Sequence, residues 1–117
     1  MSKYRVNNDG VEKAKSLIES KQYVLDSDWS DAQSSTDAQN EYLDQHGWGE
    51  YAQWFLAIDT EASEDTKGRF NFDYGDFRRV HRSGLIAAKQ RAAQNGHDAI
   101  EKAADKLLQE LDSATSE

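Results

Sequence analysis

The sequence predicts an α+β domain in which an antiparallel β-hairpin, with or without a third strand, packs against about four helices. Two observations favour this fold class. Along residues 54–59, Trp54, Leu56 and Ile58 alternate with Phe55, Ala57 and Asp59, and along residues 70–74 aromatic residues alternate with Asn71 and Asp73, which predicts two strands. Four other segments carry apolar residues at helical spacing. A chain of 117 residues suits a single domain, which we expect over residues 1–112, followed by a disordered tail at 113–117.

The first helix is expected from about Asp9 to Tyr23. Val11, Ala14 and Leu17 recur on one face, and the Asn and Asp residues before them are good N-caps. Upstream, Tyr4 and Val6 alternate with Arg5, which is the pattern of a short strand. Residues 4–6 could therefore form the third strand of the sheet.

A second helix is expected from Asp37 to His46. Thr36 and Gln39 have the spacing of a capping box, and Gly47 can end the helix in the left-handed conformation. Residues 49–53 fit either a helix or a strand, and the pattern does not decide between them.

The two strands of the hairpin are joined by the polar segment Thr60–Gly68, which is longer than a tight turn. After them, Asp76 is expected to cap a third helix that closes at Asn95 and Gly96. A fourth helix is expected from Asp98 to Leu111, because its apolar residues fill one half of the helical wheel.

The amino-acid composition argues against several classes of function, namely nucleic-acid binding, membrane binding and metal binding. The formal net charge is −8, so the overall field repels phosphate and disfavours general nucleic-acid or anionic-membrane binding. The chain has no Cys, and it has three histidines without a paired zinc-ligand spacing. No apolar run is long enough to span a bilayer. We therefore expect no metal and no cofactor in a cytoplasmic protein.

A basic stripe is the feature that best indicates function. Within the expected third helix, Arg78, Arg82 and Lys89 share one face, and the segment from Phe77 to Arg91 contains no acidic residue. Arginine side chains bind carboxylates and phosphates through paired hydrogen bonds. The stripe is thus a candidate partner or ligand site, and its neutralisation by acidic residues of the same chain is the alternative.

Two further sets of residues are candidates. His81 falls on the apolar side of the same expected helix, where it is either a hydrogen-bonded core histidine or a general acid or base. Trp48, Tyr51 and Phe55 are not needed by the strand alternation, so we expect them to form an exposed aromatic patch that contributes to binding.

The segments 66–77 and 80–89, which include Tyr74-Gly75-Asp76-Phe77 and Val80-His81-Arg82-Ser83-Gly84-Leu85, resemble a group of small, functionally uncharacterised bacterial proteins. The resemblance extends over most of residues 4–112. It implies no activity and no catalytic residues.

These observations together predict a small non-catalytic binding or interaction protein that uses a basic helix face. Its partner is expected to be an acidic protein surface or a second copy of this chain. A small anionic ligand is a further candidate. The alternative is a small enzyme that acts on an anionic substrate, with His81 as acid or base and Arg78 and Arg82 holding the anion.

Overall fold

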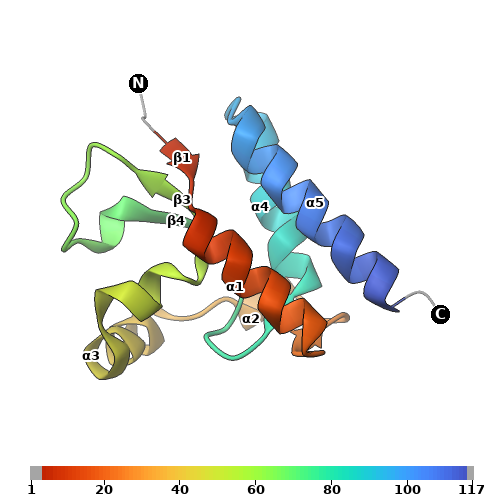
Figure 1. The fold of residues 1–117 in the computed structure, drawn as a ribbon. Helices are drawn as coiled ribbons and strands as arrows, with labels where there is room; N and C mark the ends of the chain where they lie inside the picture. The colour runs from red at the N-terminus through yellow and green to blue at the C-terminus, as the bar shows by residue number, and fades with distance from the viewer. Residues whose placement is uncertain (1–3, 116–117) are drawn as a thin grey trace.

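The computed structural model describes residues 4–115. A three-stranded antiparallel sheet lies on one side of it, next to α1, α4 and α5 (Figure 1). The strands are β1 (Tyr4–Val6), β3 (Phe55–Asp59) and β4 (Phe70–Asp73), in the order β1-β3-β4. Tyr4 pairs with Asp59. The α+β class is confirmed, and so are the hairpin and its third strand.

Helices cover both faces of this sheet. Phe55, Leu56 and Ala57 follow one another along β3, and all three are buried. Because successive side chains of a strand point to opposite faces, neither face is open here. The described helical segments are α1 (Asn8–Glu19), α2 (Trp29–Ala32), α3 (Thr36–Ala52), the 3₁₀ turn η1 (Lys67–Arg69), α4 (Arg82–Gln94) and α5 (Asp98–Thr115).

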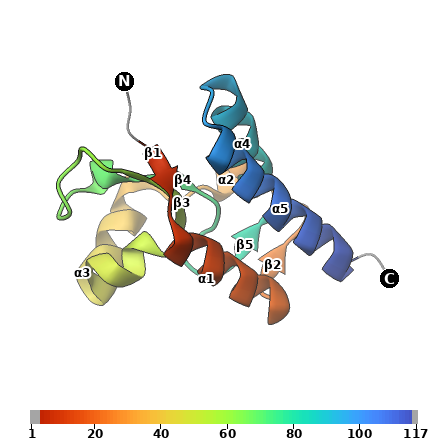
Figure 2. The ribbon, with the colours of Figure 1, turned by 45° about the horizontal axis from the view of Figure 1, so that its top comes forward.

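A second, smaller sheet was not predicted. β2 (Tyr23–Val24) and β5 (Val80–His81) run parallel to each other and lie beneath α1 and α5 in Figure 2. Tyr23 pairs with Val80, which is completely buried. This pairing joins the segment after α1 to the segment before α4, two parts of the chain that are far apart in sequence.

Three of the helices, α1, α4 and α5, pack together beside the sheet. α4 and α5 form an antiparallel pair, and α1 lies against α5 (Figure 1). α5 buries the expected apolar stripe, with Ile100, Leu107 and Leu111 almost fully inside. It continues to Thr115, so the tail expected from residue 113 is helical over its first three residues. Residues 116 and 117 lie outside the described part.

The third expected helix begins later than predicted. α4 starts at Arg82 rather than after Asp76, because the Asp76 side chain caps a turn instead of a helix. An aspartate supplies the same acceptor oxygen to either structure. The β-branched Val80 then enters β5. Arg78 therefore does not lie on the helix that carries Arg82 and Lys89.

The first two predicted helices, which correspond to α1 and α3, also differ from their predicted bounds. α1 ends at Glu19, and Lys21 turns the chain with φ 62°. α3 is capped by Ser35, whose hydroxyl accepts from the amide of Ala38, rather than by Thr36. Gly47 has φ 82° and interrupts α3, which agrees with the left-handed conformation predicted for it. Residues 49–52, which the sequence pattern left undecided between helix and strand, are helical.

Candidate functional site

The candidate site is the turn formed by residues 74–81, between β4 and α4. The Tyr74 carbonyl accepts from the His81 amide at 3.0 Å, and the Arg79 carbonyl accepts from the Asp76 amide at 3.2 Å. Gly75 permits this close reversal, because a Cβ there would lie 2.6 Å from the Arg79 carbonyl oxygen. The turn is thus a tight backbone reversal with residues 77–79 at its tip.

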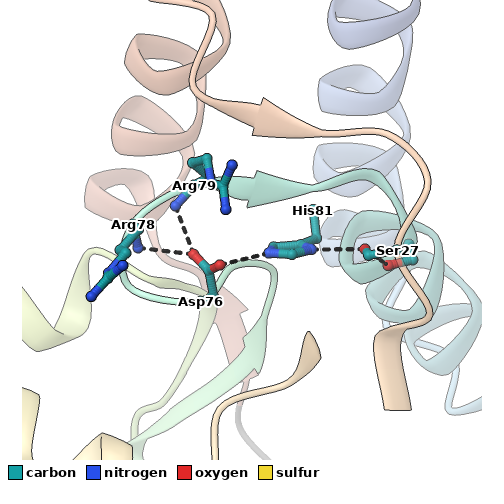
Figure 3. Close-up of polar contacts among 6 residues, drawn as sticks. Ser27, Asp76, Arg78, Arg79 and His81 are labelled. Atoms are coloured by element: carbon teal, nitrogen blue, oxygen red, sulfur yellow. Dashed lines mark hydrogen bonds and ion pairs between the residues drawn. The ribbon is translucent and has the colours of Figure 1, made fainter. Parts of the chain in front are cut away.

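Asp76 organises the tip through both carboxylate oxygens (Figure 3). Oδ1 accepts from the backbone amides of Arg78 and Arg79 at 3.0 and 2.8 Å. Oδ2 lies 2.8 Å from Nε2 of His81. Burial alone would raise the pKa of Asp76, but the hydrogen bonds from His81 and the two amides outweigh it, so the pKa is lowered. The folded turn therefore stabilises the ionised form of the Asp76 carboxyl group.

His81 extends this network into the core. It is only 5% exposed, and its Nδ1 lies 2.7 Å from the hydroxyl of Ser27. The Ser27 hydroxyl is also 2.9 Å from the hydroxyl of Ser83, in the first turn of α4. Because an ionised carboxylate only accepts, Nε2 carries the proton donated to Asp76. In the neutral imidazole, Nδ1 then accepts from Ser27.

The backbone at the tip is strained. Phe77 has φ 65°, a conformation that side chains with a Cβ rarely adopt. Its ring stacks on Tyr42 of α3, with the ring centroids 4.5 Å apart, and Tyr42 stacks in turn on His46 at 4.1 Å. The stacking on Tyr42 and the hydrogen bonds to Asp76 keep Phe77 in this conformation. Strained backbone that is stabilised by its surroundings is common at functional sites.

The strained turn exposes two adjacent arginines, Arg78 and Arg79. Within residues 4–115, neither side chain has an acidic group at ion-pair distance. Their backbone amides are fixed by Asp76 (Figure 3), and both residues are exposed. Such a pair of unpaired charges is available to an external anion.

The other two residues of the predicted basic stripe are paired within the chain. The Arg82 guanidinium binds the Asp112 carboxylate, with Nε 2.9 Å from Oδ1, and Lys89 Nζ lies 2.8 Å from Asp105. Both contacts join α4 to α5. The pKa of each cation is raised by its aspartate partner. Arg82 and Lys89 are therefore neutralised by acidic residues of the same chain, which was the alternative interpretation of the stripe. Of the three stripe residues, Arg78 alone has no acidic partner among residues 4–115.

The predicted aromatic patch does not form as expected. Tyr51 and Phe55 are 1% and 5% exposed, so the prediction of their exposure is wrong; they pack between α3 and the sheet. Trp48 is half-buried and stacks on Phe70. The sequence analysis placed these rings outside because the strand alternation does not need them, but Tyr51 lies on α3 and packs inward, and β3 is buried on both faces.

An open cleft lies beside the tip instead. It has a volume of about 320 Å³, and the rings of Tyr42, His46 and Phe77 line it together with Arg78. Glu41 lies on its α3 side. The sequence gives no signal for this arrangement, because α3 and the turn meet only in the folded chain. The cleft places ring surfaces next to a free cation.

Comparison with protein-family models, with curated proteins and with solved structures finds no match to this chain. Between residues 4 and 115, no cluster of three or more acidic or histidine side chains could hold a metal ion. Over the same residues, no helix has the length and apolar character needed to cross a membrane.

Proposed function

We propose that this protein is a non-catalytic, cytoplasmic interaction protein that binds an acidic segment of a partner protein through Arg78 and Arg79. The observation that carries the proposal is a pair of guanidinium groups with no acidic partner among residues 4–115, on a turn that Asp76 holds in a strained conformation. Because the backbone of the turn is already fixed, binding does not have to order it. The absence of Cys suits a reducing compartment.

The neighbouring cleft indicates the kind of acidic segment. Tyr42 and Phe77 offer ring surface for an apolar side chain, while Arg78 stands at the same opening. An acidic segment with one aromatic or aliphatic anchor fits both features. An extended nucleic acid fits poorly, because the net charge of −8 repels its many phosphates and the turn offers only two arginines.

The test is a binding measurement with a fluorescent peptide of about six glutamates and one central phenylalanine. Charge reversal in the double variant R78E/R79E is expected to weaken binding at least about tenfold at low salt, because attraction becomes repulsion. The matched control K102E/K106E changes net charge equally on the exposed face of α5. We expect its effect to be much smaller.

The salt dependence completes this test. The difference between wild type and R78E/R79E should shrink near 1 M salt, where the Debye length falls to roughly 3 Å. Both double variants should keep the wild-type unfolding temperature, since all four side chains are exposed. Equal loss of binding in the two variants would show that the peptide senses only the overall charge, and the proposed site would be wrong.

One observation favours a second function, the enzyme. Ser27, His81 and Asp76 are linked by hydrogen bonds of 2.7 and 2.8 Å, the connectivity of a nucleophile, a base and an orienting acid. In this reading the Ser27 oxygen attacks an ester carbonyl and His81 Nδ1 takes its proton. Nδ1 then protonates the departing alcohol, and water hydrolyses the acyl-serine. Arg82 is not available to hold an anion, because Asp112 already binds it.

A fluorophosphonate probe tests the enzyme directly, because it labels serines that a neighbouring base activates. We expect no labelling of Ser27, since His81 is buried and serves the turn. Mass spectrometry of the probe-treated protein gives the readout, and S27A is the control. Labelling that is present in wild type and lost in S27A would favour the enzyme over the interaction protein.

A further inference from the structure

A second cleft, which shares no lining residue with the first, contains a partly desolvated carboxylate. It has a volume of about 180 Å³ and lies where β4, α4 and the segment near α2 meet, with Asp73 on its wall. Burial raises the pKa of Asp73, an effect that Gln33 and Arg91 oppose only in part. The side-chain amide of Gln33 is 3.4 Å from each carboxylate oxygen, a long contact for a hydrogen bond.

Two cations line the same cleft without neutralising this carboxylate. Lys67, from η1, and Arg91, from α4, are both lining residues. Within the described residues 4–115, neither comes within ion-pair distance of Asp73. The guanidinium of Arg91 is held over the ring of Phe72, 5.3 Å from its centroid. The cleft is thus lined by one carboxylate and two cationic side chains that form no ion pair with it.

The backbone beside the carboxylate is strained. Phe72 has φ 65° in the middle of β4, where an extended conformation is expected. The strained residue, Phe72, directly precedes Asp73, and its ring lies under the guanidinium of Arg91. Desolvation of an acid and backbone strain both cost stability, and their coincidence in a cleft is typical of a ligand site.

We propose that this cleft binds a free α-amino acid, whose ammonium group donates to Asp73 and whose carboxylate is held by Arg91 and Lys67. An α-amino acid carries its ammonium and carboxylate groups on one carbon atom, so it can compensate an acid and a base that do not reach each other. The small volume suits a ligand of this size. Asn71 and Gln33 add hydrogen-bonding groups at the rim. This site is separate from the Arg78–Arg79 turn and does not depend on the function proposed for it.

The test is an NMR titration of the full chain with the common protein amino acids, one at a time. At least one is expected to shift the signals of Asn71 and Asp73 and to saturate below about 10 mM. D73N and R91Q should each weaken that binding about tenfold or more, since each removes a charged hydrogen-bonding partner. The exposed substitutions E64Q and K102Q are matched controls and should leave it unchanged.

Acetate and methylamine, the two halves of the zwitterion, complete the experiment. Neither alone should bind as tightly as the amino acid, because each leaves one charge of the cleft uncompensated. D73N removes an unfavourably buried charge, so it should fold at least as well as wild type, which thermal unfolding will verify. The proposal is overturned if no amino acid shifts these signals, if binding survives in D73N, or if acetate alone binds equally well.

Discussion

Replacing Asp76 with alanine is expected to lower the free energy of unfolding by about 3 kcal/mol at neutral pH. The substitution removes the acceptor of two backbone amides and the partner of a buried imidazole nitrogen. It also releases the strained Phe77. Binding of the glutamate-rich peptide should weaken as well, because Arg78 and Arg79 are no longer held in place.

The loss should depend on pH in a definite direction. The pKa of Asp76 is lowered in the folded protein from a value near 3.8 in the unfolded chain. Its stabilising effect is therefore complete above the unfolded pKa and is lost as the pH falls through the folded pKa. Urea unfolding of wild type and D76A should give curves that converge at acid pH.

Asp28 provides the control for this experiment. Its exposed carboxylate accepts from the amide and hydroxyl of Ser30, at the start of α2, and its pKa is also lowered, by these hydrogen bonds. D28A removes a comparable local contact at a surface position and should cost much less stability. If D76A and D28A cost equally little, Asp76 does not organise the turn.

Replacing Gly10 with alanine is expected to cost about 3 to 4 kcal/mol, the largest effect of any single methyl group considered for this chain. A Cβ at Gly10 would lie 1.8 Å from the carbonyl oxygen of Phe55. That same oxygen accepts from the side-chain amide of Asn7 at 2.9 Å. The methyl group would therefore push α1 away from β3 and break a buried hydrogen bond.

Gly49 is the matched position, because a Cβ there meets nothing within 4 Å. G49A lies in α3 and should be neutral or stabilise by up to roughly 1 kcal/mol, following helix propensity. Denaturant unfolding of both variants gives the comparison. Equal stabilities for G10A and G49A would mean that α1 and β3 are not in the close contact described.

The elements that sequence could predict are those whose signal is local. The amphipathic pattern of α5, the apolar run of β3 and the alternation of β4 each lie within one segment. The turn at 76–79 could not be distinguished from a helix start, because Asp76 caps either one and the apolar residues after it have helical spacing. Only the pairing of Val80 with Tyr23 decides between the two structures.

The candidate site was predictable only in part, for the same reason. The clustering of positive charge was visible in the sequence, and Arg78 was among the predicted residues. Which arginines stay free depends on α5, since Asp112 and Asp105 meet Arg82 and Lys89 only after the helices pack. Ser27 reaches His81 through the parallel pairing of two-residue strands, which leaves no pattern in the sequence.

The central claim is that Arg78 and Arg79 form the binding surface, and NMR of arginine side chains tests it most directly. The Nε–Hε signals of wild type are followed while the glutamate-rich peptide is added. The signals of Arg78 and Arg79 should shift and saturate, while that of Arg82, already bound to Asp112, should stay in place. Uniform small shifts of all arginines, or no shift at Arg78 and Arg79, would contradict the account.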